Sequence, residues 1–410
     1  MLPKQLDFRL AVSQATRNYH PEFLKVFDQK FSGKFIRTEY GEFPNRMPLY
    51  LVGSAERVLL LFWLNGDNFR ETTAEIALAG EALTVNPDAA GANTKDLGVM
   101  FPFIDLRQHD RTRHPIPDSL GRAIAKAQGI TNDALAKVIR FVAGAHYVVT
   151  VDMHNPWRSS EPFRQAGLDF INLATNKILA DSLVKNGFVK RREEIVVAST
   201  DIGNLVSARD LAKKLGRVLG RKRLPLAINL KTRIGTEVDQ QLVYGDIAGK
   251  VVVTADDMIS SGGTTAETVE TLKGAGAARI VFYATHPVFV GNYYENLSLL
   301  LADPNIKIVV SNSLPFMRDG RNIALPYARL DNRINKITVM DISHWLAEKT
   351  EVILKTPNLT QAKKALREEI IAPVNPYEVL SKITGRKISP PKDVAVYLEG
   401  GKVVPLPDLV

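Results

Sequence analysis

Short apolar runs alternate with helical stretches along most of the chain, and this alternation constrains the fold more than any other feature. The runs are rich in β-branched and aliphatic residues, as in strands that are buried on both faces of a parallel sheet. The predicted strands are Val58–Leu64, Tyr147–Val151, Ile195–Ser199, Leu226–Leu230, Val251–Ala255, Ile280–Ala284 and Lys307–Ser311. The predicted helices are Ser119–Gln128, Leu205–Leu219 and Thr265–Gly274. This pattern predicts an α/β fold with mostly parallel sheets flanked by helices.

The length of 410 residues exceeds one ordinary core and suggests two domains with extra segments. An internal echo supports this division. The tripeptide Ala-Gly-Ala stands at 143–145 and again at 275–277, each time before an apolar run. The first run ends at Asp152-Met153-His154 and the second at Thr285-His286-Pro287. Duplication of one α/β unit would produce this echo, and so would chance, because Gly-Ala before a strand is common.

The charge balance suits anionic partners without pointing to nucleic acid. The chain has 53 basic and 44 acidic residues and a net charge of +9. The surplus lies in short clusters, such as Lys190–Arg192 and Arg221–Arg223, rather than in a basic tail or a known nucleic-acid motif. We therefore expect small polyanionic ligands and no nucleic acid. The absence of Cys excludes disulfides, thiolate zinc sites and a Cys nucleophile.

The hydrophobic runs predict no membrane partner. The run at Val58–Leu64 is one of the longest, and it is far shorter than the roughly 20 residues that a spanning helix needs. The first residues also lack the apolar core of a signal peptide. We expect a soluble, cytoplasmic protein.

The segment VVVTADDMISSGGTT at 251–265 carries the clearest chemistry. A buried strand leads into the adjacent acids Asp256 and Asp257, then into a loop of small residues and a helix. Backbone N–H groups in such a loop form an anion pocket, and Gly262 and Gly263 let a phosphate approach the backbone. Hydroxyl donors are available from Ser260, Ser261, Thr264 and Thr265. Paired carboxylates suit vicinal hydroxyls, so the segment predicts a ribose 5-phosphate site; the alternative is a structural turn with an Asp N-cap.

This segment resembles the loop that binds phosphoribosyl diphosphate (PRPP) in phosphoribosyltransferases and PRPP synthetases. The resemblance implies that residues Asp256, Asp257, Ser260, Ser261, Gly262, Gly263, Thr264 and Thr265 bind ribose 5-phosphate. Four further stretches resemble the synthetases, which are ribose-phosphate diphosphokinases. They are Val151–His154, Val197–Arg209, Leu230–Arg233 and Thr285–Phe289, within a collinear resemblance from about residue 38 to 350.

The resemblance also implies roles for individual residues. His154 and Asp201 would be linked to the Mg²⁺ of MgATP, and Lys231 and Arg233 would be the catalytic cations that open a mobile loop. The implied ATP-binding residues are Glu42, Arg107, Gln108, Asp110, Arg111 and His154. The polar segment after Arg233, Ile234–Gln241, is expected to be a closing loop.

Several positions depart from the family pattern. Ser260 stands where the family has a third acid, and Asn204 stands where it has a second glycine. Of the family's adenine-contacting Phe-Ser-Asp-Gly-Glu, only Gly and Glu remain, in Thr38–Glu42. The family's Arg-Gln-Asp-Arg appears as Arg107–Arg111 with one residue inserted or shifted. These departures concern nucleotide binding more than ribose-phosphate binding.

As a whole, the resemblance implies two similar phosphoribosyltransferase-like domains and a defined reaction. The first domain would cover 1–155 with 332–350 returning to it, the second 156–331, and 357–410 would be a C-terminal appendage. The enzyme, a homo-oligomeric dimer or hexamer, would transfer the diphosphoryl group of ATP to O1 of ribose 5-phosphate with Mg²⁺. The products would be PRPP and AMP.

The chemistry is consistent with this reaction. Attack by a sugar hydroxyl on the β-phosphorus requires in-line positioning and charge neutralisation rather than covalent help, and Lys231 and Arg233 could supply cations. His286 is expected to be structural, because its turn needs the side chain for hydrogen bonding. Two alternatives remain: a non-catalytic or regulatory synthetase homologue, and a phosphoribosyltransferase that consumes PRPP.

Overall fold

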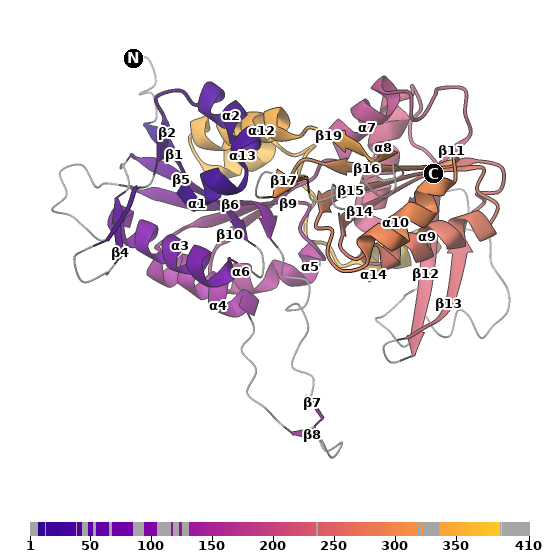
Figure 1. The fold of residues 1–410 in the computed structure, drawn as a ribbon, viewed down its shortest axis with the longest axis horizontal. Helices are drawn as coiled ribbons and strands as arrows, with labels where there is room; N and C mark the ends of the chain where they lie inside the picture. The colour runs from indigo at the N-terminus through magenta and orange to yellow at the C-terminus, as the bar shows by residue number, and fades with distance from the viewer. Residues whose placement is uncertain are drawn as a thin grey trace. The chain divides into compact units, whose positions relative to one another are not determined.

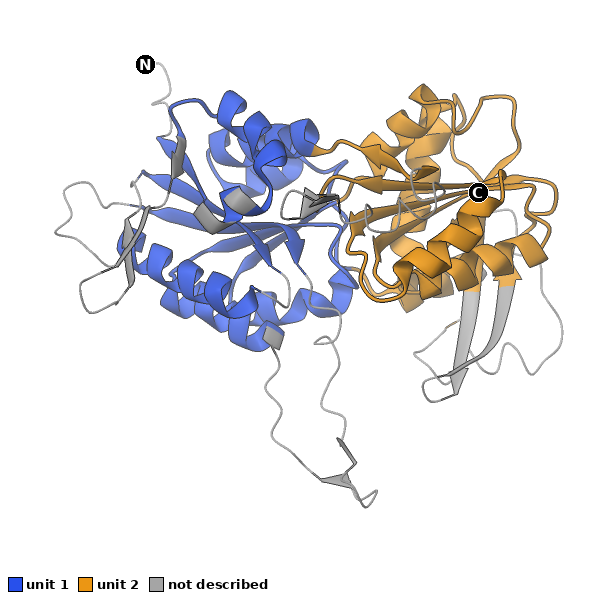
Figure 2. Ribbon diagram, in the orientation of Figure 1, with its two compact units in different colours: residues 1–173, 343–373 blue, residues 174–342, 374–410 orange. Residues whose placement is uncertain are grey.

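The computed structural model describes residues 7–12, 14–37, 39–42, 48–51, 55–64, 68–84, 94–104, 116–117, 123–124, 131–234, 237–315, 317–318, 321–322, 336–385 and 387. The chain divides into two compact units, which are coloured separately in Figure 2. Unit 1 consists of residues 1–173 and 343–373, and unit 2 consists of residues 174–342 and 374–410. Both units are α/β.

Unit 1 is built on a six-stranded sheet with the order β10-β9-β6-β5-β1-β2, in which every neighbouring pair is parallel (Figure 1). The strands are β1 (Phe8–Val12), β2 (Phe35–Arg37), β5 (Arg57–Leu64), β6 (Asp96–Ile104), β9 (Tyr147–Val151) and β10 (Asp169–Leu173). The described residues of the central strands β5 and β9 are buried throughout, as their continuous apolar sequences predict. Two small antiparallel ladders join β3 (Glu39–Glu42) to β4 (Pro48–Leu51) and β7 (Ile116–Pro117) to β8 (Ala123–Ile124).

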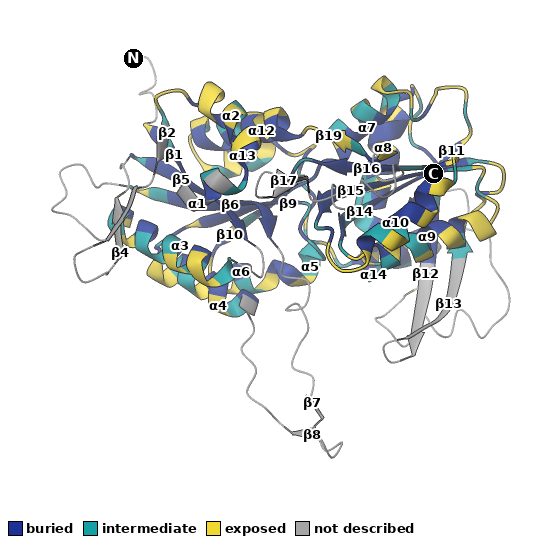
Figure 3. Ribbon diagram, viewed as in Figure 1, coloured by how far each residue is buried: buried dark blue, intermediate teal, exposed yellow. Residues whose placement is uncertain are grey.

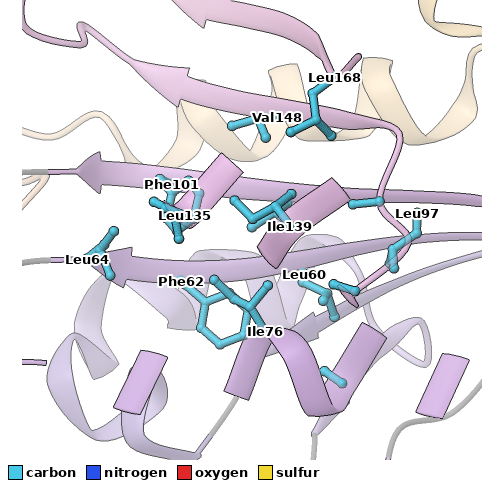
Figure 4. Packing of buried hydrophobic residues seen from close by; sticks show 14 of the residues in the cluster. Leu60, Phe62, Leu64, Ile76, Leu97, Phe101, Leu135, Ile139, Val148 and Leu168 are labelled. Atoms are coloured by element: carbon cyan, nitrogen blue, oxygen red, sulfur yellow. The ribbon is translucent and has the colours of Figure 1, made fainter. Parts of the chain in front are cut away.

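Helices pack against both faces of this sheet (Figure 1). On one face, α3 (Phe69–Thr84), α4 (Thr131–Lys137), η1 (Val138–Val142) and α6 (Glu161–Gln165) enclose a buried apolar cluster. Figure 4 shows how Ile76, Leu135 and Ile139 of these helices meet Leu60 and Phe62 of β5. The remaining helices of the unit are α1 (Gln14–Tyr19), α2 (Pro21–Lys30), α5 (Pro156–Ser159), α12 (Ser343–Lys355) and α13 (Leu359–Ala365).

Unit 2 is built on a seven-stranded sheet with the order β13-β12-β11-β14-β15-β16-β19. All neighbours are parallel except β12 and β13, which form an antiparallel hairpin at one edge. The strands are β11 (Ile195–Ser199), β12 (Leu226–Ile234), β13 (Glu237–Tyr244), β14 (Val251–Ile259), β15 (Arg279–Pro287), β16 (Ile306–Ser311) and β19 (Thr338–Met340). The two-residue strands β17 (Met317–Arg318) and β18 (Arg321–Asn322) pair separately.

The helices of unit 2 cover both faces of its sheet. On one face, α9 (Gly263–Gly274) and α10 (Tyr293–Ala302) pack over the larger apolar cluster. On the other, α8 (Leu205–Val218) packs against α7 (Asn176–Lys185) and α14 (Pro376–Thr384). Figure 3 shows buried residues along the strands and mixed exposure on the helices, as in two-faced helices that cover a sheet. No described helix is both long and apolar enough to cross a membrane.

The predicted fold class is confirmed, and all seven predicted strands are present. One predicted helix, Ser119–Gln128, is wrong where it can be compared. Ala123 and Ile124 form β8, and Ile124 pairs with Ile116 of β7; the other residues of that helix lie outside the described ranges. Isoleucine is a β-branched residue that favours strands, and Gly121 weakens a helix at this point.

The compact units differ in their boundaries from the expected domains. The first boundary was expected after residue 155 but falls after Leu173, because β10 extends the sheet of unit 1 by pairing with β9. The segment that returns to unit 1 is 343–373 rather than 332–350. The expected appendage, 357–410, is divided: its first part belongs to unit 1, and α14 buries Val379, Leu380 and Ile383 in unit 2.

The internal echo has a structural counterpart. In both units a helix ends at a glycine with a left-handed backbone, and a strand with a parallel neighbour on each side follows it. The glycines are Gly144, with a φ of 70°, and Gly276, with a φ of 87°. Glycine adopts this conformation without the steric penalty of a Cβ atom. The same order of helix, glycine and strand also occurs at Gly167, Gly187 and Gly220, so it does not by itself distinguish a duplicated unit from chance.

Candidate functional site

The strand order of unit 2 reverses beside β11. The chain passes from β11 to β12 on one side, and then to β14 on the other side of β11. In open parallel sheets, ligands bind at the carboxyl ends of the strands at such a switch point. Ser199 at the end of β11 is aligned with Ala255 of β14. The polar residues that follow each of them, Thr200-Asp201 and Asp256-Asp257, therefore stand at the switch point.

The acid pair lies where β14 is held on only one side. The described pairing with β11 ends at Ala255, whereas pairing with β15 continues to Ile259. Asp256 and Asp257 are both half-buried, and the N–H group of Asp257 donates to Asp256 Oδ1 at 3.0 Å. Half-buried carboxylates beside an open strand edge are suited to accept hydrogen bonds from hydroxyl groups of a ligand.

The loop after the acids leads into α9, and no described side chain caps the N-terminus of that helix. Gly262 is the N-cap residue, with a left-handed φ of 77°. A Cβ atom at Gly262 would lie 3.2 Å from Asn296 Cβ, so both the backbone conformation and the close packing require glycine. The N–H groups of the first helical turn have no partner within the helix, and such groups at a helix N-terminus can bind an anion.

The segment between β15 and α10, together with Asn296 of α10, forms hydrogen bonds with the carbonyl groups at 259–261, where the loop begins. The N–H groups of Val288 and Phe289 donate to the Ile259 carbonyl at 2.9 and 3.1 Å, and that of Val290 donates to the Ser260 carbonyl at 3.2 Å. Asn296 Nδ2 donates to the Ser261 carbonyl at 2.8 Å. These bonds hold the carbonyl groups of the loop. Asn296 was not predicted from sequence, because no local pattern connects α10 with this loop.

Asp201 begins the turn between β11 and α8. Its side chain is exposed, and its Oδ1 accepts a hydrogen bond from the N–H group of Asn204 at 2.9 Å. A Cβ atom at Gly203 would approach Asp201 Oδ1 to 3.2 Å, so a larger residue would crowd the carboxylate. The exposed carboxylate suits Mg²⁺, which prefers oxygen ligands and retains several waters. Among the described residues, no group of three or more His, Cys, Asp or Glu side chains forms a metal cluster.

Lys231 and Arg233 lie on β12, in the hairpin at the edge of the sheet. Lys231 is aligned with Gln241 and Arg233 with Val238, and the register shifts between Thr232 and Arg233. The segment Ile234–Gln241, expected to be a closing loop, forms part of this hairpin in its described residues, and its closing role stays a prediction. Ile234 ends β12 and 237–241 lie in β13, which pairs with β12 in antiparallel register. The side chains of Lys231 and Arg233 lie outside the described part of the structure.

His154 belongs to a constrained turn at the carboxyl end of β9, in unit 1. Asp152 and Asn155 flank it with left-handed φ values of 37° and 43°. The N–H group of Met153 donates to Asn172 Oδ1 at 2.9 Å, which ties the turn to β10. The His154 side chain is half-buried. Non-glycine residues with such φ values are strained, and strain of this kind accumulates at functional turns.

The other predicted ATP-binding residues are only partly described. Glu42 ends β3, where its backbone is aligned with Pro48. Arg107, Gln108, Asp110 and Arg111 lie outside the described residues.

His286 occupies a buried position at the end of β15. It is 2% exposed, and its Nδ1 lies 2.9 Å from Ser313 Oγ. The hydrogen bond predicted for this side chain is therefore confirmed. The Ser313 hydroxyl also donates to the Thr285 carbonyl at 2.8 Å, so the histidine is part of a buried polar network in unit 2. Burial and bonding of this kind stabilise the end of the strand.

The chain is similar to known proteins of one kind over much of its length. Residues 224–362 match the family described as phosphoribosyl synthetase-associated domain. A ribose-phosphate pyrophosphokinase of Caldanaerobacter subterraneus is 25% identical over 81% of this chain and 92% of that protein. A ribose-phosphate pyrophosphokinase of Wolinella succinogenes is 29% identical over 57% of this chain and 66% of that protein. One of Marinomonas sp. is 34% identical over 47% of this chain and 56% of that protein.

The fold matches a solved structure over most of both chains. The crystal structure of phosphoribosylpyrophosphate synthetase from Mycobacterium smegmatis covers 85% of this chain and 98% of its own, with a TM-score of 0.59 and 22% identity. This chain spans just over half to most of the length of the relatives above. The chain is thus a distant homologue of ribose-phosphate pyrophosphokinases (PRPP synthetases), at 25–34% identity, and it shares its fold of two mostly parallel sheets with the Mycobacterium smegmatis synthetase.

Proposed function

We propose that this protein is an active ribose-phosphate diphosphokinase, which converts ATP and ribose 5-phosphate into AMP and PRPP with Mg²⁺. The observation that carries the proposal is the loop at the switch point of unit 2. There the acids Asp256 and Asp257 precede α9, whose N-terminus is capped by Gly262 and by no described side chain. A diol site beside an anion site is the arrangement that ribose 5-phosphate requires. We also propose a cytoplasmic homo-oligomer, a dimer or hexamer.

The chemistry proposed for this site is an in-line displacement. The O1 oxygen of ribose 5-phosphate attacks the β-phosphorus of ATP, the bond from that phosphorus to the bridging oxygen of AMP breaks, and the O1 proton passes to solvent. The loop Ser260–Thr265 holds the 5-phosphate through N–H and hydroxyl donors, and Asp256 and Asp257 accept from the ribose hydroxyls. This binding fixes O1 in position, so the entropy of bringing the reactants together is lost on binding and not in the transition state.

Positive charge would come from β12. Lys231 and Arg233 neutralise the charge that develops on the diphosphoryl oxygens, and the guanidinium of Arg233 can bind two oxygens at once. Glu42, Arg107, Gln108, Asp110, Arg111 and His154 are assigned to ATP. A bound Mg²⁺ would supply further neutralisation of the polyphosphate, and Asp201 is proposed to hold it through water. The exposed Asp201 carboxylate fits this ion better than the imidazole of His154, because Mg²⁺ prefers oxygen ligands.

One assay tests the proposal. The purified protein is incubated with ATP, ribose 5-phosphate and Mg²⁺, and AMP and PRPP are quantified by chromatography. We expect the two products in equal amounts, and none when ribose 5-phosphate is omitted. Release of ADP or free phosphate in place of AMP would contradict the transfer of a diphosphoryl group.

A non-catalytic or regulatory synthetase homologue is the second candidate. Its support is Ser260 in the loop together with the altered adenine segment at Thr38–Glu42. Such a protein would bind ribose 5-phosphate without making PRPP, and adding it to an active synthetase would change the activity of that enzyme. A phosphoribosyltransferase is a third candidate, which would consume PRPP in the presence of a nucleobase. Chromatography separates the three if the incubation is repeated with PRPP and a nucleobase, and with an active synthetase to which this protein is added.

A further inference from the structure

Asn204 makes three hydrogen bonds that a glycine at its position could not all make. Its backbone N–H donates to Asp201 Oδ1 at 2.9 Å, a bond available to any residue except proline. Its Nδ2 donates to Thr200 Oγ1 at 3.1 Å and also to the Ala255 carbonyl. The last two bonds need the side-chain amide, which the family's glycine lacks. Asn204 is therefore more than a tolerated replacement in the turn.

The bond to Ala255 links the Asp201 turn, which follows β11, to the end of β14 that carries the acid pair. Ala255 is the last residue of β14 in the described pairing with β11, and Asp256 follows it directly. Beyond this pair the strand ladder provides no described bond between the two strand ends. The side chain of Asn204 supplies one there, from the turn that carries Asp201 to the residue that precedes the acid pair. A half-buried amide with two acceptors is also fixed in orientation.

We propose that Asn204 is a positioning residue that sets the separation between Asp201 and the Asp256-Asp257 pair. This inference rests on the proposed function, in which Asp201 serves the nucleotide side of the reaction and the acid pair serves the sugar. Transfer between two bound substrates is sensitive to their separation, and a misplacement of about 1 Å lowers the rate by up to about a hundredfold. Binding of each substrate alone depends much less on it. Loss of the Asn204 bridge therefore affects kcat more than the KM for ribose 5-phosphate.

The test compares three variants. Asn204→Ala keeps the backbone N–H to Asp201 and removes both side-chain bonds. Thr200→Val removes only the bond to Thr200 and leaves the link to Ala255. Asn186→Ala, at the exposed end of α7, is the matched control, because it loses a single bond from Asn186 Nδ2 to Ser182 Oγ of 3.0 Å, far along the chain from the turn. If Asn204→Ala does not fold, Asn204→Ser replaces it, since serine lacks the amide donor.

We expect Asn204→Ala to lower kcat for PRPP formation about tenfold, with the KM for ribose 5-phosphate within about twofold of the original. Thr200→Val retains most of the activity, and Asn186→Ala retains all of it. An Asn204→Ala protein with unchanged kcat overturns the inference while the proposed function stands. An equal loss of kcat in Thr200→Val also overturns the assignment to the Ala255 link.

Hydrogen exchange gives a readout that does not depend on activity. Peptides that span 252–262 are followed by mass spectrometry in the protein without substrates. We expect faster exchange in Asn204→Ala than in the original protein or in Asn186→Ala, because the end of β14 loses its link to the Asp201 turn. If exchange in Asn204→Ala equals that in the original protein, the hydrogen bond from Asn204 to Ala255 does not stabilise the end of β14, whether or not the protein makes PRPP. If the original protein makes no PRPP, the proposed function fails, and exchange alone decides whether the bridge exists.

Discussion

Arg57 Nε donates a hydrogen bond to Asp96 Oδ2 at 2.6 Å, between two residues that are directly aligned at the start of β5 and β6. The same guanidinium bonds the carbonyl groups at the end of α12, including that of Ile353 at 3.1 Å and that of Pro357 at 3.3 Å. One buried cation thus joins the sheet of unit 1 to the helix that returns to it. Arginine suits this position because its planar donors can bind several acceptors at once.

We expect Arg57→Ala to destabilise unit 1 by about 3–5 kcal/mol, because it leaves Asp96 and several carbonyl groups without their buried partner. The stability of Arg57→Lys should fall between that of the original protein and that of Arg57→Ala, since an ammonium cannot reach all the acceptors. Urea unfolding followed by circular dichroism measures both. The control is Arg164→Ala, which removes an exposed pair with Glu161 and should cost less than about 1 kcal/mol. Equal losses in the Arg57→Ala and Arg164→Ala proteins would contradict this role.

Because of its buried hydroxyl, Tyr147 should make the protein less stable at alkaline pH. Its hydroxyl is buried and has no hydrogen-bond partner among the described residues. Burial raises the pKa of Tyr147 far above its ordinary value of 10.0, Asp96 raises it further, and Arg57 partly opposes the shift. The unfolded chain therefore loses this proton near pH 10 while the folded chain keeps it, so stability declines as the pH rises above about 10.

The Tyr147→Phe variant should lack this part of the decline. It keeps the ring, which packs so closely on Gly98 that a Cβ there would lie 2.2 Å from the tyrosine ring. The free energy of unfolding, measured from pH 8 to pH 11, should fall more steeply in the original protein than in the variant. If the two curves are parallel, ionisation of Tyr147 does not contribute to the loss of stability at alkaline pH.

Arg233→Ala and Lys231→Ala should each lower the kcat of PRPP formation by about a hundredfold or more. A cation that neutralises charge formed in the transition state contributes to turnover and little to binding of the ground state. The KM for ribose 5-phosphate should therefore change little. Steady-state kinetics with varied ribose 5-phosphate tests this, and an increased KM with unchanged kcat would assign these residues to substrate binding instead.

Asp257→Asn should weaken ribose 5-phosphate binding by about tenfold, because an amide has one acceptor oxygen where a carboxylate has two. Isothermal titration without ATP measures this affinity directly. Asp246→Asn is a control, since Asp246 lies in the loop before β14 and is exposed, with an ion pair to Lys250. Unchanged affinity in Asp257→Asn would remove Asp257 from the proposed sugar site.

Ser260→Asp restores the acid that the family pattern has at this position. If Ser260 is a tolerated variation, activity should stay similar or rise, and this is the result we expect. If the loop has been adapted to another anion, the new carboxylate would repel the bound phosphate and affinity for ribose 5-phosphate would fall steeply. Titration of ribose 5-phosphate in Ser260→Asp and in the charge-neutral Ser260→Asn distinguishes charge from size.

The sequence alone was sufficient for the α/β class and for seven strands of the two large sheets, β5, β9, β11, β12, β14, β15 and β16, but it did not predict β1, β2, β6, β10, β13 or β19. Strands such as β9 and β11 begin and end where their apolar runs do, because burial on both faces requires an unbroken apolar sequence. It was also sufficient to select Asp256–Thr265 as a single candidate segment, because a strand, two acids, small residues and a helix are consecutive there. Local order along the chain determines features of this kind.

The tertiary structure decided which distant residues meet. Asn204 and Ala255, or Asn296 and Ser261, come together only because β11, β14 and α10 pack in one unit. Likewise, β10 joins unit 1 through its pairing with β9, and β12 and β13 pair as a hairpin that the sequence did not predict. Hydrogen bonds between segments far apart in sequence depend on the packing of the whole core, and no local pattern of residues encodes them.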